Sequence, residues 1–162
     1  MGSKPKPDML RAPGDDGMKE VLTVSYAYDE DRHELDLGGE ALPRLVIDNR
    51  GIPQERRGGT ATRLLAGASL YCYGSMLAAA LIARGVDFED LRADAVVEKD
   101  RNEQGKTRVL RMTIRCSVRV NERDEAVFRR VRKMMEQGCL ITGSVHDGIA
   151  MEYELTPEFF SE

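Results

Sequence analysis

The residues best able to carry chemistry in this 162-residue chain are its three cysteines, Cys72, Cys116 and Cys139. A cysteine thiolate is a nucleophile, and its oxidation to a sulfenic acid or a disulfide is reversible. No two of the cysteines form a Cys-x-x-Cys pair, and three is an odd number, which argues against a framework of structural disulfides. The cysteines therefore point either to packing or to thiol redox chemistry.

The local context of each cysteine indicates whether packing or redox chemistry is the commoner role there. Cys116 lies on the apolar side of an alternating segment, where a cysteine behaves as a small buried hydrophobe, so we expect packing. Cys72 lies between Tyr71 and Tyr73 in an uncharged run, where packing is also the commoner role. Cys139 directly follows a predicted helix end, where a functional and a structural thiol are equally common. Composition does not choose between these roles.

Other chemistries find little support. His33 and His146 are the two histidines, and neither has a partner at metal-ligand or catalytic-triad spacing, so we expect no metal and no cofactor. Neither a Gly-x-x-x-x-Gly-Lys nor a Gly-x-Gly-x-x-Gly phosphate-binding motif is present. With 24 basic and 28 acidic residues, a net charge of −4 and no basic stripe, nucleic acid is not an expected partner.

The element that must position Cys72 is an uncharged run over residues 64–83, which Arg63 and Arg84 flank. Its length fits a membrane-spanning helix, but its glycines, serines and tyrosines dilute its hydrophobicity. A helix that is apolar all round can equally be the buried centre of a soluble protein, and we predict this role and no membrane partner. No apolar signal region follows Met1, so a cytoplasmic location with free thiols is expected.

The remaining segments predict strands around that helix, followed by a second helix that leads to Cys139. The predicted strands cover residues 21–28, 33–37, 44–47, 91–99, 107–120 and 149–155, and the second helix covers 124–137. We expect Pro157 to limit the last strand. Residues 1–17 contain three prolines and three glycines and predict a disordered tail, which leaves residues 18–162 as a single domain. This order of elements is typical of an α+β fold.

Two stretches resemble motifs of the OsmC/Ohr peroxidase family. RLLAGASLYC, ending at Cys72, is similar to the central-helix motif before the first reactive cysteine, and EQGC, ending at Cys139, is similar to the second motif. The two cysteines are 67 positions apart, close to the family's spacing, and the order of elements matches over roughly residues 20 to 155. The resemblance implies antiparallel sheets around a long buried central helix, in an intertwined homodimer with the reactive site between subunits.

The resemblance also implies a mechanism. Cys72 would reduce an organic hydroperoxide and become a sulfenic acid, Cys139 would resolve it as a disulfide, and a dithiol would reduce that disulfide. Cys139 would follow a helix C-terminus, whose negative end disfavours a thiolate and suits a resolving role. The family activates its first cysteine with an arginine from the N-terminal part of the chain, for which Arg44, Arg56 and Arg57 are candidates.

The sequence departs from the family pattern in two places. Thr62 lies near the position where the family's peroxidases carry a glutamate, and Leu140-Ile141-Thr142 follows the second cysteine where proline and valine are common. Two alternatives to a peroxidase therefore stay open. One is a non-catalytic OsmC-like dimer that binds a small apolar ligand or a partner in its cleft. The other is an interaction protein in which all three cysteines are packed.

Overall fold

The computed structural model describes residues 20–161, which divide into two compact units, residues 20–56 and residues 57–161. Each unit is described by itself. The predicted disordered tail of residues 1–17 lies outside the described residues, and the single domain over residues 18–162 stays a prediction.

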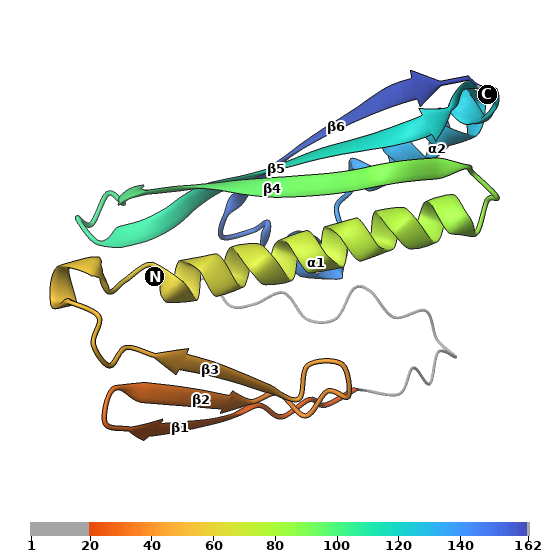
Figure 1. The fold of residues 1–162 in the computed structure, drawn as a ribbon. Helices are drawn as coiled ribbons and strands as arrows, with labels where there is room; N and C mark the ends of the chain where they lie inside the picture. Colours follow the sequence, from red (N-terminus) through yellow and green to blue (C-terminus); the bar gives the residue numbers. More distant parts are fainter. Residues whose placement is uncertain (1–19, 162) are drawn as a thin grey trace, which may run out of the picture. The chain divides into compact units, whose positions relative to one another are not determined.

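The N-terminal unit is a three-stranded antiparallel sheet in the order β1-β2-β3 (Figure 1). Its strands are β1 (Ser25–Asp29), β2 (Arg32–Asp36) and β3 (Arg44–Asp48), and a short 3₁₀ helix, η1 (Gln54–Arg56), ends the unit. Glu30 and Asp31 join β1 to β2, and both have positive φ, as the two-residue turns of twisted hairpins require. The first strand begins later than predicted, and none of residues 20–56 is buried.

The second unit contains a three-stranded sheet and three helices. In chain order its elements are α1 (Thr60–Ile82), β4 (Phe88–Arg101), β5 (Thr107–Asn121), η2 (Glu122–Asp124), α2 (Glu125–Met135), α3 (Leu140–Val145) and β6 (Ala150–Phe160). The α+β class is therefore confirmed. The short helix α3 is the one helix of this unit that the sequence patterns did not predict.

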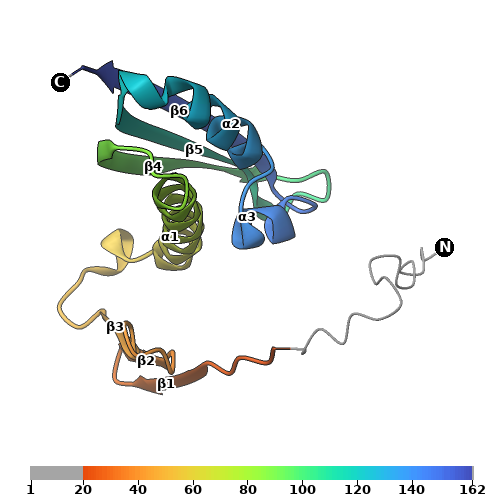
Figure 2. The ribbon, with the colours of Figure 1, turned by 90° about the vertical axis from the view of Figure 1, so that its right-hand side faces the viewer.

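The core of the second unit lies on one face of the β4-β5-β6 sheet. Alternate residues of β5 are fully buried there, namely Met112, Ile114, Cys116, Val118 and Val120. Helices α1 and α2 both pack on this face (Figure 2), contributing Tyr73, Leu77 and Leu81 from α1 and Phe128, Val131 and Met135 from α2. The intervening arginines of β5 form ion pairs on the opposite face, such as Arg115 with Glu154 at 3.2 Å. The predicted alternation of apolar and polar residues over β5 is thus confirmed.

Two features of β6 correct the sequence prediction. The strand runs parallel to β5, whereas we expected antiparallel sheets throughout. The chain between these two strands carries α2 and α3, and a crossover of this length permits a parallel return. The strand also continues through Pro157 to Phe160, where we expected it to stop. Because β6 lies at the edge of its sheet, it can contain a proline.

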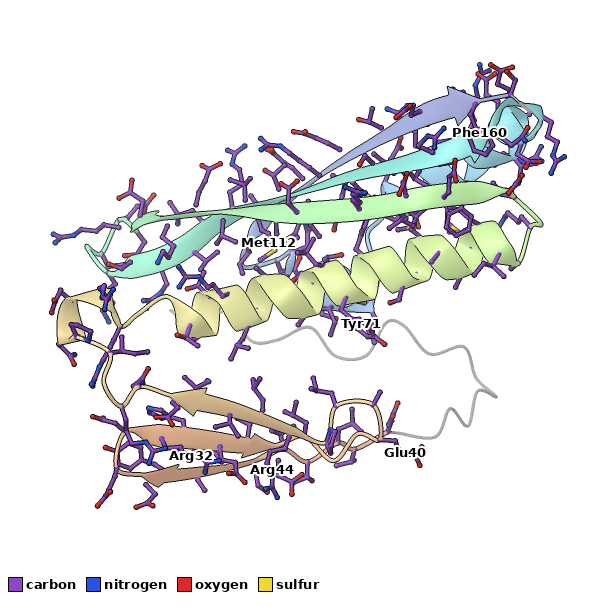
Figure 3. The ribbon with its side chains drawn as sticks, viewed as in Figure 1. Arg32, Glu40, Arg44, Tyr71, Met112 and Phe160 are labelled. Carbon is purple, nitrogen blue, oxygen red and sulfur yellow. The ribbon has the colours of Figure 1, made fainter. Side chains whose placement is uncertain are left out.

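Helix α1 buries one face and exposes the other. Its buried residues are Ser69, Tyr73, Leu77, Ala80 and Leu81. The opposite face is exposed and uncharged, and it consists of Leu64, Gly67, Ala68, Tyr71, Ser75, Ala79 and Ile82. Figure 3 shows Tyr71 pointing away from the β4-β5-β6 sheet, while Met112 points from that sheet toward the helix. The predicted long buried helix is therefore only half buried within one chain.

Helix α1 is long and apolar enough to cross a membrane, but core helices of soluble proteins can have the same length and composition. Its buried stripe packs against a sheet that has its own apolar core, which is the arrangement of a core helix. This packing agrees with the predicted soluble fold.

Candidate functional site

The structure brings Cys72 and Cys139 together. Cys72 lies on α1 beside the buried Tyr73 and is half-buried, while Cys139 is buried and precedes α3 as its N-cap residue. The two thiols lie close enough for each to shift the pKa of the other. Two cysteines that are 67 positions apart in the chain thus share one site, as the resemblance implied.

Backbone N–H groups at the start of α3 surround both sulfurs. The N–H groups of Leu140 and Ile141 lower the pKa of Cys72, and those of Ile141 and Thr142 lower the pKa of Cys139. These are N–H groups that the first turn of a helix leaves without intrahelical partners. Because they favour a charged acceptor, the arrangement stabilises a thiolate on the sulfur pair.

Thr142 completes the cap of α3. Its hydroxyl accepts a hydrogen bond from the backbone N–H of Cys139 at 2.9 Å and lies 3.4 Å from the Cys139 sulfur. Its side chain is fully buried. In the sequence, Thr142 stands out only as a departure from the family pattern. The signal that could have assigned its role is the spacing of three between Cys139 and Thr142, which is the spacing of a capping box.

The turn into this site depends on Gly138, which has a φ of 74°. A Cβ atom at this position would lie 2.6 Å from the Thr142 hydroxyl and would also collide with the hydroxyl of Tyr153. Tyr153 in turn stacks on Tyr73 with ring centroids 5.2 Å apart. The glycine thus permits both the backbone conformation and the close packing around Cys139.

The two thiols have shifted acidities of opposite direction. Burial raises the pKa of Cys139, but hydrogen bonds from the Cys72 thiol, the Thr142 hydroxyl and backbone N–H groups outweigh burial and lower its pKa below the usual value. Burial and the hydrogen bond to Cys139 raise the pKa of Cys72, against the opposing N–H groups of α3. The negative charge of the pair therefore resides mainly on Cys139.

This result corrects the electrostatic argument made from the sequence. We expected Cys139 to face only the negative end of a preceding helix, which would disfavour its thiolate. The Cys72 thiol lowers the pKa of Cys139 most, and because Cys139 also begins α3, the Thr142 hydroxyl and backbone N–H groups of that helix lower it further.

Cys116 lies in a different environment from this pair. It is buried on the core face of β5, and burial raises the pKa of its thiol to about 11. A thiol with this pKa is protonated at neutral pH and chemically inert. The predicted packing role of Cys116 agrees with this environment.

In the sequence, the three candidate arginines lie before the second unit or at its first residue. Arg44 is in β3 of the N-terminal unit (Figure 3) and forms an ion pair with Glu34 at 2.9 Å. Arg56 ends η1, and Arg57 is the first residue of the second unit. A role for any of them beside Cys72 stays a prediction. Within residues 20–161, no group of three or more His, Cys, Asp or Glu side chains is arranged to hold a metal ion.

Comparison with known proteins identifies related chains. The family described as OsmC-like protein matches residues 54–154. No curated protein sequence matches the chain. An OsmC-like protein from Mycoplasma pneumoniae is similar in structure, with a TM-score of 0.65 at 12% identity over 86% of this chain and 99% of that chain.

Two further solved structures show the same fold. An OsmC-like protein of unknown function from Vibrio cholerae aligns with a TM-score of 0.62 at 13% identity, covering 88% of this chain and 100% of that chain. The organic hydroperoxide resistance protein OhrB of Bacillus subtilis aligns with a TM-score of 0.55 at 13% identity, covering 85% of this chain and 98% of that chain. At these identities the likeness shows a shared fold.

Proposed function

The chain belongs to the OsmC-like protein family, and on that premise we propose that it is a thiol peroxidase that reduces organic hydroperoxides. Cys72 is the nucleophile in this proposal, and Cys139 resolves the intermediate. The single observation that carries the proposal is the proximity of these two thiols, each of which shifts the pKa of the other. The structural similarity to a protein named for organic hydroperoxide resistance favours this substrate class.

The proposed reaction consumes two thiols for each hydroperoxide. The Cys72 thiolate attacks the terminal oxygen of the hydroperoxide, so the O–O bond breaks, Cys72 becomes a sulfenic acid and the alkoxide takes a proton to leave as an alcohol. The Cys139 thiolate then attacks the Cys72 sulfur, a disulfide forms, and hydroxide leaves and is protonated to water. A dithiol reductant returns both cysteines to thiols by disulfide exchange.

The relative exposure of the two cysteines supports this order. Cys72 is half-buried and Cys139 is buried, so a hydroperoxide reaches Cys72 more readily. The raised pKa of Cys72 opposes its role as the first nucleophile and calls for a cation nearby. We propose that Arg44, Arg56 or Arg57 supplies that cation.

We further propose a homodimer in the cytoplasm. From Leu64 to Ile82 the exposed face of α1 around Tyr71 carries no charge, and Tyr71 itself is 79% exposed. The sheet of the N-terminal unit likewise leaves Tyr26 and Tyr28 exposed. A second copy of the chain would cover such apolar surfaces, and an intertwined dimer is what the family resemblance implies.

The test is mass spectrometry of the reduced protein after brief exposure to cumene hydroperoxide or to hydrogen peroxide. We expect a disulfide between Cys72 and Cys139 that forms faster with the organic peroxide. The Cys139→Ser variant should accumulate a sulfenic acid on Cys72, while Cys116→Ser should behave as the wild type. Unmodified thiols after exposure would reject the peroxidase and favour the non-catalytic OsmC-like dimer that binds an apolar ligand.

A further inference from the structure

We propose that Thr142 is a positioning residue for the second step of the reaction, in which its hydroxyl donates a hydrogen bond to the Cys139 thiolate and releases that sulfur when the disulfide forms. This inference rests on the proposed function for the reaction step, but the hydrogen bond can be tested without any peroxide.

The single proton of the Thr142 hydroxyl can be donated to either of two acceptors. The backbone N–H of Cys139 donates to the hydroxyl oxygen at 2.9 Å and thereby fixes one of its lone pairs. The remaining neighbours are the Cys139 sulfur at 3.4 Å and the Cys139 carbonyl oxygen at 3.5 Å. Because Thr142 is fully buried, its hydroxyl must satisfy its hydrogen bonds within the protein.

The charge on the sulfur decides between these two acceptors. A thiolate accepts a hydrogen bond much more strongly than a neutral sulfur, so the hydroxyl proton points to Cys139 while that sulfur is charged. When the thiolate attacks the Cys72 sulfenic acid, the new S–S bond removes the charge and hydroxide leaves. The hydroxyl then turns to the carbonyl oxygen. Thr142 therefore favours the attacking thiolate over both the thiol and the disulfide.

The other titratable groups that face Cys139 do not replace this donor. Cys72 and Tyr73 face it from α1, and Tyr153 packs against the adjoining Gly138 from β6. Burial raises the pKa of Tyr73, so this phenol stays neutral. The Cys72 thiol lowers the pKa of Cys139, but its S–H proton is gone once Cys72 has become the sulfenic acid that is attacked in this step.

The test measures the ultraviolet absorbance of thiolate against pH in the reduced full-length protein. A parent protein that carries Cys72→Ser and Cys116→Ser keeps Cys139 as its one thiol, so the titration step of this parent belongs to Cys139. Thr142→Val should raise the midpoint of that step by about one pH unit or more, since hydrogen bonds to charged groups are among the stronger ones. Thr142→Ser keeps the hydroxyl and should titrate near the parent. Thr113→Val, which removes another buried hydroxyl on the opposite face of β5, should leave the step unchanged.

The outcomes separate this inference from the proposed function. A raised midpoint of the Cys139 step in Thr142→Val, with a normal midpoint in Thr142→Ser, supports the hydrogen bond even if the protein does not react with hydroperoxides. An unshifted Thr142→Val, or an equal shift in both variants, overturns it, even if the wild type is an active peroxidase. Thr142→Ala gives the same readout if Thr142→Val does not fold. In an active enzyme, Thr142→Val should also slow disulfide formation while leaving sulfenic acid formation on Cys72 unchanged.

Discussion

At the scale of single residues, Cys116 should lower the stability of the protein at alkaline pH. Burial raises the pKa of Cys116 from 9.0 to about 11. The unfolded chain therefore loses this proton first, and the stability contribution is complete below pH 9 and falls as pH rises toward 11. Since each pKa unit corresponds to about 1.36 kcal/mol, the free energy of unfolding should fall by roughly 2–3 kcal/mol.

Urea unfolding between neutral pH and pH 11 checks this prediction against the Cys116→Ala variant. The variant should start lower because it leaves a small cavity, but its stability should fall less steeply with pH. Parallel curves for the two proteins would contradict the assigned pKa.

The arginine that activates Cys72 can be identified by three separate substitutions. We expect one of Arg44→Gln, Arg56→Gln and Arg57→Gln to slow oxidation of Cys72 by about tenfold or more, since each pKa unit changes the thiolate fraction tenfold below the pKa. Arg115→Gln is the matched control, because Arg115 pairs with Glu154 on the face of the sheet opposite the core. Stopped-flow kinetics with cumene hydroperoxide gives the rates. Wild-type rates in all three variants would exclude these three arginines from the activation of Cys72.

The sequence predicts single residues well only where a motif carries them. Cys72 and Cys139 stand out through two family motifs, and the environment of Cys116 follows from the alternation along its strand. Thr142 was missed because its role depends on which residue begins a helix too short to leave a periodic pattern. The direction of the Cys139 pKa was missed for the same reason.

At the scale of elements, the turn between α2 and α3 depends on Gly138. Gly138→Ala should destabilise the fold by about 1–3 kcal/mol, because a side chain at positive φ is strained and the added methyl collides with Thr142 and Tyr153. Gly143→Ala is the control, since it lies within α3 and its added methyl meets nothing within 4 Å. Thermal unfolding compares them.

The same pair of variants also reports on the thiol site. Gly138→Ala should slow formation of the disulfide between Cys72 and Cys139, whereas Gly143→Ala should not. A Gly138→Ala protein with normal stability and normal disulfide formation would show that this turn does not hold the site.

Elements with a strong local pattern were predictable, and their directions in the sheet were not. The alternation in β5 and the uncharged run of α1 each fix an element and its buried face. A pattern of alternation looks the same in a parallel and an antiparallel strand, so the direction of β6 depended on the path of the preceding crossover. Its extension past Pro157 depended on the position of β6 at the sheet edge.

At the scale of the whole molecule, the exposed face of α1 leads to a prediction about assembly. We expect the wild type to sediment as a dimer and Tyr71→Glu to sediment as a monomer, because a charge would be buried in the interface. Gln104→Glu adds the same charge in the exposed turn between β4 and β5 and should stay dimeric. Analytical ultracentrifugation distinguishes the two states, and a wild-type monomer would refute the proposed dimer.

Dimerisation should also be visible in the unfolding temperature. The midpoint of the wild type should rise with protein concentration, since association stabilises the folded state by mass action. The midpoint of Tyr71→Glu should be independent of concentration.

The lack of buried residues between positions 20 and 56 has a consequence for how the protein is made. Chains emerge from the ribosome N-terminus first, and early domains usually fold as soon as they appear. This segment appears first but has no core of its own, so it cannot fold on arrival. At ~5–20 residues per second, synthesis of residues 57–162 takes roughly 5 to 20 s. During that interval the nascent chain exposes Tyr26, Tyr28 and their apolar neighbours. We therefore expect chaperones at the ribosome exit to bind this segment.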